Sequence, residues 1–176
     1  MILTQRPAAG EYAASFADYV GRVADDEDIV AALVTQLDQV LARLGRIPEP
    51  RGDYRYAPEK WSVKEIVGHL CDTERVFAYR ALRIGRGDTT PLASFDDQAY
   101  VAEVRAGDRA LAGLVAEWGD VRRATIALFG HLPAEAWHRR GTASDQPVSV
   151  RALAYIIAGH VRHHLQTLEE RYTMSG

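Results

Sequence analysis

Four long stretches of the sequence repeat apolar residues every three or four positions, and this spacing constrains the fold more than any other feature. Residues at i, i+3, i+4 and i+7 lie on one face of an α-helix, so each stretch predicts an amphipathic helix. No strand-like alternation and no internal repeat is visible. The sequence therefore predicts an all-α fold, a four-helix bundle. The stretches cover residues 28–44, 62–85, 108–130 and 149–168.

Residues that commonly cap helices mark the ends of these stretches. Ser62 and Glu65 have the spacing of a capping box, in which each side chain accepts a hydrogen bond from the other residue's amide. Asp108 and Ser149 are the expected caps of the third and fourth helices. The acidic run 25–28 favours a helix start through the helix dipole. The connections of about 15–25 residues exceed those of a minimal bundle, so they could form the rim of a site.

Shorter elements are expected between the long helices. Residues 11–23 have the spacing of a short amphipathic helix, and a helical piece is expected around 96–105. Pro133 can start a single helical turn. A polar loop is expected through residues 145–147.

Composition excludes several classes of protein. The 176 residues suffice for one domain with a substantial core, and we expect a single domain over residues 1–176. A net charge of −3 offers no electrostatic basis for binding nucleic acid. No stretch approaches the roughly 20 apolar residues of a membrane span, and the N-terminus lacks the apolar run of a signal peptide, so a cytoplasmic location is expected. Cys71, the single cysteine, cannot form an internal disulfide and is expected to be a buried structural thiol.

The last predicted helix contains three of the six histidines. At 100° per residue, His160 and His164 point toward its apolar face and His163 points toward solvent. Imidazoles at i and i+4 are one turn apart, so both can reach one ion at roughly 2.0–2.2 Å. The alternative is a pair of hydrogen-bonded core or interface residues. His69, at the border of the buried face of the second helix, is the candidate for a third ligand.

A set of His69, His160 and His164 would leave coordination positions open, as in catalytic metal sites. The metal would lower the pKa of a bound water or thiol and so produce a nucleophile near neutral pH. Imidazole ligands suit several divalent ions and do not select one. We expect zinc or nickel, with iron or manganese as further candidates.

Other polar residues near these histidines have two interpretations each. Asp72 could accept a hydrogen bond from a ligand imidazole, or could be a surface carboxylate paired with Arg75 or Arg80. Glu65 is expected to be a helix cap rather than a general base. His131 and His138 are expected to be exposed. The three tryptophans are expected to be core or interface anchors.

Three segments together resemble the DinB/YfiT-like family. Residues 61–74, WSVKEIVGHLCDTE, resemble the second-helix segment whose histidine is the first metal ligand of that family. Residues 159–166, GHVRHHLQ, resemble its last helix, whose HxxxH pair supplies the other two ligands, and residues 91–100 resemble its proline-then-phenylalanine-acidic loop. The resemblance runs from about residue 25 to 172. It implies a four-helix bundle, commonly a homodimer, and a divalent metal on His69, His160 and His164.

The resemblance implies three possible functions for a small-molecule substrate. Characterised relatives include S-transferases that use a low-molecular-weight thiol such as bacillithiol or mycothiol. We therefore expect a metal-dependent thiol S-transferase that attacks an electrophilic small molecule. A metal-dependent hydrolase would use the same ion with water as the nucleophile. The third possibility is a non-catalytic, stress-related metal- or ligand-binding protein whose dimer matters more than chemistry.

Overall fold

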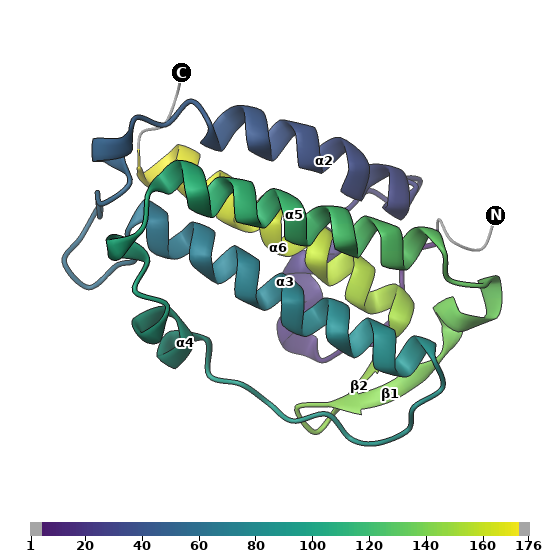
Figure 1. Ribbon diagram of the computed structural model, residues 1–176. Coiled ribbons are helices and arrows are strands. Elements are labelled where there is room, and N and C mark those ends of the chain that lie inside the picture. The colour runs from purple at the N-terminus through teal and green to yellow at the C-terminus, as the bar shows by residue number, and fades with distance from the viewer. Residues whose placement is uncertain (1–4, 173–176) are drawn as a thin grey trace.

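Four long helices pack side by side in the computed structural model, which describes residues 5–172 (Figure 1). α3 contacts both α5 and α6, and α2 contacts the same two helices. The all-α four-helix bundle expected from the apolar spacing is therefore confirmed. Within the described residues, no helix has both the length and the apolar composition needed to cross a membrane. The long helices are α2 (Ile29–Leu44), α3 (Val63–Gly85), α5 (Leu111–Gly130) and α6 (Val150–Arg171).

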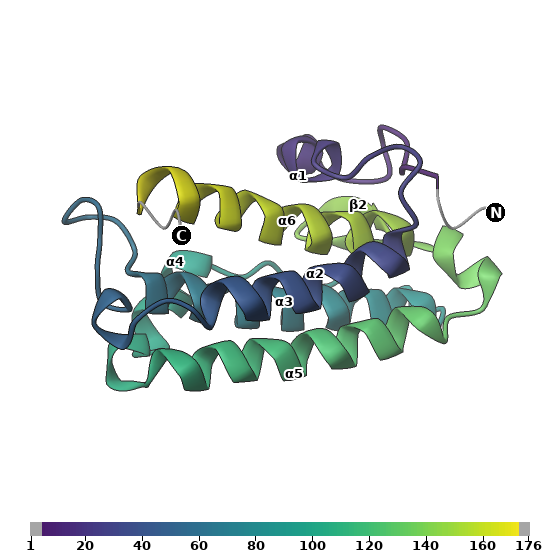
Figure 2. The same ribbon diagram turned by 90° about the horizontal axis from the view of Figure 1, so that it is seen from above.

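Two short helices lie outside this bundle. α1 (Ala17–Gly21) lies on the outer side of α6, and α5 lies on the opposite side of the bundle (Figure 2). α4 (Asp97–Glu103) confirms the helical piece expected around 96–105 and contacts α3. The turn expected after Pro133 is a 3-10 helix, Ala134–His138.

Most of the expected caps are present. The Ser62 side chain accepts from the Glu65 amide at 3.2 Å, and the Glu65 carboxylate accepts from the Ser62 amide at 2.7 Å. Asp28 caps α2 and Ser149 caps α6 through side-chain oxygens. These hydrogen bonds satisfy amides of the first turn that have no partner within the helix.

The cap expected from Asp108 is wrong. α5 begins after Ala110, which has no side chain able to cap it. The Glu49 carboxylate instead accepts from the Leu111 amide at 2.9 Å. Glu49 belongs to the connection between α2 and α3, so this cap comes from a residue remote in sequence.

The expectation of no strands is also wrong. β1 (Arg140–Ala143) and β2 (Gln146–Ser149) form an antiparallel hairpin in place of the polar loop. Ser144 and Asp145 form its two-residue turn with φ of 53° and 59°, as in a type I′ turn, whose twist matches that of the strands. Leu92 hydrogen-bonds to Thr142 and Ser144 at 2.9 and 3.0 Å, which ties the connection after α3 to the hairpin.

A buried polar network joins the four long helices. The Arg122 guanidinium donates to both oxygens of the Glu74 carboxylate at 2.7 and 2.9 Å. Arg122 also donates to the Gln36 side chain, and Gln36 donates to the carbonyl of Ala158 at 3.0 Å. A buried ion pair is tolerated when its charges are compensated by hydrogen bonds in this way. The network fixes α6 two residues before His160.

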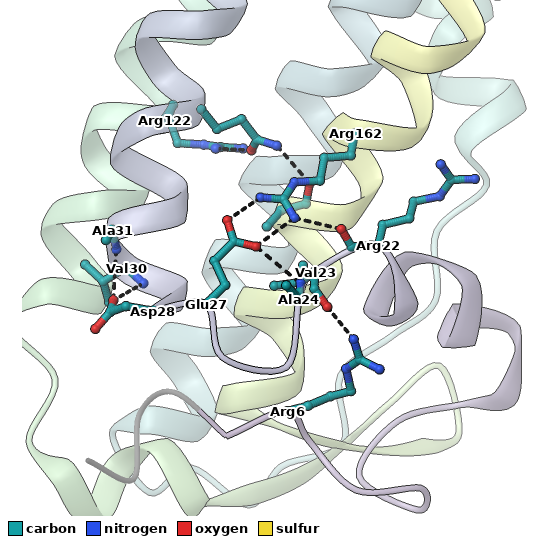
Figure 3. Close-up of polar contacts among 12 residues, drawn as sticks. Arg6, Arg22, Val23, Ala24, Glu27, Asp28, Val30, Ala31, Arg122 and Arg162 are labelled. Carbon is teal, nitrogen blue, oxygen red and sulfur yellow. Dashed lines mark hydrogen bonds and ion pairs between the residues drawn. The ribbon is translucent and has the colours of Figure 1, made fainter.

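A second polar contact holds the N-terminal segment against α6. Arg162 donates to the carbonyl of Arg22 at 2.7 Å and to the carboxylate of Glu27 at 2.6 and 2.9 Å (Figure 3). Since Arg162 lies between the histidines of α6, these bonds place α1 beside them.

Candidate metal centre

Three imidazoles from α3 and α6 meet in the interior of the bundle. Nε2 of His160 lies 2.9 Å from Nε2 of His69 and 3.0 Å from Nε2 of His164. The candidate ligand atoms of all three residues lie within 4.8 Å of one another. The residues are 6%, 4% and 9% exposed for His69, His160 and His164. His69 is thus buried rather than at the border of the helix face.

Burial keeps these imidazoles neutral. Desolvation disfavours the charged ring and lowers the pKa of His69 to about 4, although the carboxylate of Asp97 opposes this. Desolvation, followed by the neighbouring imidazoles, holds the pKa of His160 and His164 well below its usual value. A neutral imidazole offers a nitrogen lone pair, which is the form that binds a metal ion.

The three nitrogens fit a divalent cation better than they fit each other. A neutral Nε2 has either one proton or one lone pair, so that of His160 can make only one of its two close N···N contacts as a hydrogen bond. A shared cation would accept all three lone pairs. At metal–nitrogen distances of about 2.0–2.1 Å, tetrahedral ligand nitrogens lie roughly 3.3 Å apart. Small side-chain rotations would open the observed separations to that value.

Thr73, rather than Asp72, lies at the outer nitrogen of a candidate ligand. Its Oγ1 is 3.3 Å from Nδ1 of His69, one helical turn earlier. Asp72 instead forms an ion pair with Arg75 at 3.3 Å. Of the two interpretations of Asp72, the structure shows the ion pair with Arg75, and no described hydrogen bond joins Asp72 to a candidate ligand imidazole.

Aromatic rings surround the imidazoles. The ring centroid of Trp61 lies 4.7 Å from that of His69, and the ring of Tyr19 lies 5.3 Å from His160. The ring of Phe77 lies 6.5 Å from His160. Trp61 is therefore a wall of the site, a role not predicted from the sequence. Its position directly before the capping serine of the helix that contains His69 is the only signal that the sequence offers.

Two cavities reach the imidazoles from different sides. The first has a volume of about 250 Å³, and His69 and His160 line it. The second has a volume of about 270 Å³, and His164 lines it. The first is rich in aromatic residues, and its other lining residues are Phe16, Tyr19, Thr73, Phe77, Arg80, Phe95, Asp97 and Ser144. The second is lined by Tyr56, Glu59, Lys60, Trp61, Ile66, Gln98, His163, Thr167 and Tyr172 in addition to His164.

Three of the remaining candidates are not ligands of this site, whereas His163 lies beside it, with its ring centroid 5.1 Å from that of His164. His131 and His138 are exposed, as expected. His163 is half-buried and lines the second cavity, with Nδ1 3.7 Å from a carboxylate oxygen of Asp18. Burial raises the pKa of the Cys71 thiol to about 12, so this sulfur is protonated at neutral pH. The expectation of a buried structural thiol is confirmed.

Comparisons with known proteins agree with this geometry. A family model described as the DinB superfamily matches residues 32–168. No curated protein matches the chain. Among solved structures, the chain is similar to YfiT from Bacillus subtilis, described as "a probable metal-dependent hydrolase with an unusual four-helix bundle topology". The two share 17% identity with a TM-score of 0.73 over 86% of this chain and 89% of that one, a likeness of fold.

Proposed function

This chain belongs to the DinB superfamily, and on that premise we propose that it is a metal-dependent enzyme with His69, His160 and His164 as the ligands of a divalent cation. The observation that carries the proposal is the convergence of three buried, neutral imidazole nitrogens at one point between two cavities. A bound cation supplies positive charge that lowers the pKa of a thiol or water and so yields a nucleophile at neutral pH.

The protein's own residues prepare this point for chemistry. When Nδ1–H of His69 donates to Thr73, the lone pair of its Nε2 faces the other two rings. Trp61, Tyr19 and Phe77 cover the edges of the imidazoles and limit the access of water. A drier site strengthens electrostatic interactions within it.

The two cavities favour transfer of a group between two molecules. Such a transfer requires two binding spaces that meet at one reactive point, whereas hydrolysis requires one space and water. We therefore propose a thiol S-transferase. The low-molecular-weight thiol occupies the cavity beside His164, which Glu59 and Lys60 also line, and the electrophile occupies the aromatic cavity beside His160. The thiol sulfur forms a bond to the electrophilic carbon, the leaving group departs with its electron pair, and the thiol proton passes to solvent.

A metal-dependent hydrolase is the second candidate, because the similar structure of YfiT is described as one. In that reaction the substrate would occupy one cavity and water would take the place of the thiol. The ligand set is the same for both reactions.

One experiment separates these functions. Untagged protein, with its metal content measured, is mixed with a bromobimane-type electrophile in the presence and absence of a panel of thiols, and with ester substrates in water. Turnover that requires a thiol supports the transferase, and turnover with water alone supports the hydrolase. No turnover despite a bound metal would indicate the non-catalytic binding role. His160→Gln should abolish either activity, whereas the exposed His131→Gln should retain it.

The homodimer, the single domain over residues 1–176 and the cytoplasmic location stay predictions. Sedimentation of the purified chain at several concentrations tests the dimer directly.

A further inference from the structure

Arg80 is a buried cation without a carboxylate partner among residues 5–172. It is 4% exposed and lines the cavity that His69 and His160 also line. Its Nη2 donates to the carbonyl of Ala93 at 2.8 Å and to Oγ of Ser144 at 2.9 Å, but its Nε has no hydrogen-bond partner. Burial lowers the pKa of Arg80, and no described carboxylate opposes this shift.

Other buried arginines of the chain are paired. Arg122 contacts the carboxylate of Glu74, and Arg151 contacts that of Glu11. Burying an unpaired charge is costly, so a guanidinium that lacks an anion needs compensation. Aromatic rings provide part of this compensation through cation–π attraction, because Cζ of Arg80 lies 5.8 and 5.6 Å from the ring centroids of Phe77 and Phe95. Its formal charge still has no counter-ion within the described part of the chain.

The guanidinium is aligned with the candidate metal centre along one helix face. His69, Thr73, Phe77 and Arg80 are spaced by four, four and three residues on α3, and all four line the same cavity. Eleven residues span about 16 Å of helix axis and return to nearly the same direction. The cavity therefore runs along α3 from the imidazoles toward Arg80.

The charges in this cavity differ between its two ends. Asp97 lines this cavity, and its neighbour Gln98 lines the other cavity together with His164, so Asp97 lies toward the imidazole end. Arg80 supplies a positive charge at the other end. Phe77 lies between His69 and Arg80 on α3, and its ring packs against those of Phe16 and Phe95 at centroid distances of 5.8 and 6.4 Å.

We propose that this cavity binds a small apolar carboxylate, with the carboxyl group on Arg80, the apolar body between the aromatic rings and the opposite end at the imidazoles. One unpaired positive charge matches a monoanion, and Asp97 disfavours a second negative charge. The volume of about 250 Å³ lies just below the roughly 300–1,000 Å³ usual for small-molecule sites, which restricts the ligand to a small molecule. The assignment of this ligand as the substrate rests on the proposed function, whereas its binding by Arg80 does not.

Binding of three probes to the full-length purified protein tests the proposal. Calorimetry compares 3-phenylpropanoate with its neutral amide and with 2-phenylethyl phosphate. The carboxylate should bind at least tenfold more tightly than the amide and more tightly than the phosphate. Equal binding of acid and amide overturns the proposal, and tighter binding of the phosphate overturns the assignment of a carboxylate.

Substitutions identify the group responsible. Arg80→Met should remove the preference for the acid, and Arg80→Lys should retain part of it. Arg83→Gln makes the same change in charge one turn away, where Arg83 pairs with Asp88, and should leave the preference intact. A structural role would instead lower the melting temperature of Arg80→Met, and we expect no decrease because an unpaired buried charge is removed. If that variant fails to fold, an undiminished preference in a folded Arg80→Lys variant would count against Arg80, because a partial loss is expected.

A further variant separates this proposal from the metal hypothesis. His164 is a candidate ligand but lines the other cavity, so the His164→Gln variant should keep the preference for the carboxylate. If His164→Gln loses the preference and Arg80→Met keeps it, a metal ion holds the carboxylate. The role of Arg80 would then be wrong while the proposed function stands.

Discussion

The backbone carbonyl oxygen of Tyr19 lies where a side chain on Gly159 would begin, since a Cβ built on Gly159 would be 1.9 Å from it. Gly159 directly precedes His160, and the ring of Tyr19 lies against that imidazole. α1 therefore touches α6 backbone to backbone beside a candidate ligand, and only glycine allows this approach.

Replacing Gly159 by alanine should displace α1. The clash is with backbone rather than with a flexible side chain, so we expect a loss of about 1–3 kcal/mol in the free energy of unfolding. Urea denaturation measures the loss, and limited proteolysis reports whether residues 12–24 become accessible. Gly113→Ala is the control, because a Cβ there meets nothing within 4 Å and alanine favours a helix. Unchanged stability of Gly159→Ala would show that α1 is not seated as described.

Each candidate ligand should be required for the metal. Changing His69, His160 or His164 singly to glutamine should lower the metal content of untagged protein from near one ion per chain to a small fraction of that, because two imidazoles seldom hold an ion alone. Elemental mass spectrometry measures the content. His138→Gln, at an exposed position, should keep the metal. If a variant of His69 still contained about one metal ion per chain, α3 would supply no ligand to the site.

Thr73 should tune the affinity without being a ligand. Thr73→Val keeps the shape of the side chain but loses the oxygen beside Nδ1 of His69, so metal affinity should fall by roughly 10- to 100-fold. Competition with a chromophoric chelator measures this change. Thr73→Ser should restore the affinity, and Asp72→Asn should not alter it. If Asp72→Asn lowered the metal affinity and Thr73→Val did not, Asp72 rather than Thr73 would be the hydrogen-bond partner of the His69 ring.

The buried pair of Glu74 and Arg122 should show strong coupling. Glu74→Leu leaves a buried guanidinium without its carboxylate and should cost about 3–5 kcal/mol of stability. A double variant, Glu74→Leu with Arg122→Met, removes both charges and should cost less than the sum of the two single changes. Urea unfolding of the four proteins completes the cycle. Additive losses would show that the two charges do not depend on each other.

Stability should depend on pH through Glu11. Burial raises its pKa, but hydrogen bonds from Arg151, Ser149 and the amide of Ala8 outweigh this and leave the pKa below 4.5. A carboxyl whose pKa is lowered on folding contributes stability above its unfolded value and loses it as pH falls through the folded value. Glu11→Gln should therefore be less stable than the native chain at pH 7, by about 1–3 kcal/mol.

That difference should narrow as the pH falls below about 4.5, because the unfolded chain then binds a proton at Glu11, whereas the folded chain, with its lower pKa, binds it only at a still lower pH. Urea midpoints at pH 7, 5 and 3.5 measure it. Asp26→Asn, on the exposed surface, should show little difference at any of these values. If the difference in stability between Glu11→Gln and the native chain were the same at all three pH values, the charge of Glu11 would not be the stabilising feature.

The sequence predicts the parts of this fold that depend on local rules. The apolar stripes give the four long helices, and Ser62 with Glu65 marks a helix start, because a cap uses atoms only three residues apart. The cap of α5 was missed because Glu49 reaches it from 62 positions away. The hairpin was missed because each strand has four residues, too few to establish alternation, and its turn lacks the usual Asn-Gly or Asp-Gly pair.

The residues of the candidate site also fall into those that local spacing predicts and those that depend on contacts between distant segments. The HxxxH spacing brings out His160 and His164 because both lie on one helix, whereas His69 was a candidate only from its place near the buried face of another helix, and the family resemblance added the ligand role. Arg80 had a local signal that was not used, namely its spacing of three and seven residues from Phe77 and Thr73 on the face of His69. Tyr19 had none, since its contact depends on how α1 docks on α6.

The attachment of the first helix to the last has a consequence for biosynthesis. A ribosome completes α1 long before α6, so α1 has no surface to dock on until nearly the whole chain has been made. His160 and His164 also arrive in that final helix, and contacts between such distant segments form slowly. A chain interrupted before α6 would hold a single one of the three imidazoles, so the proposed ion could be bound only after translation has passed the last helix.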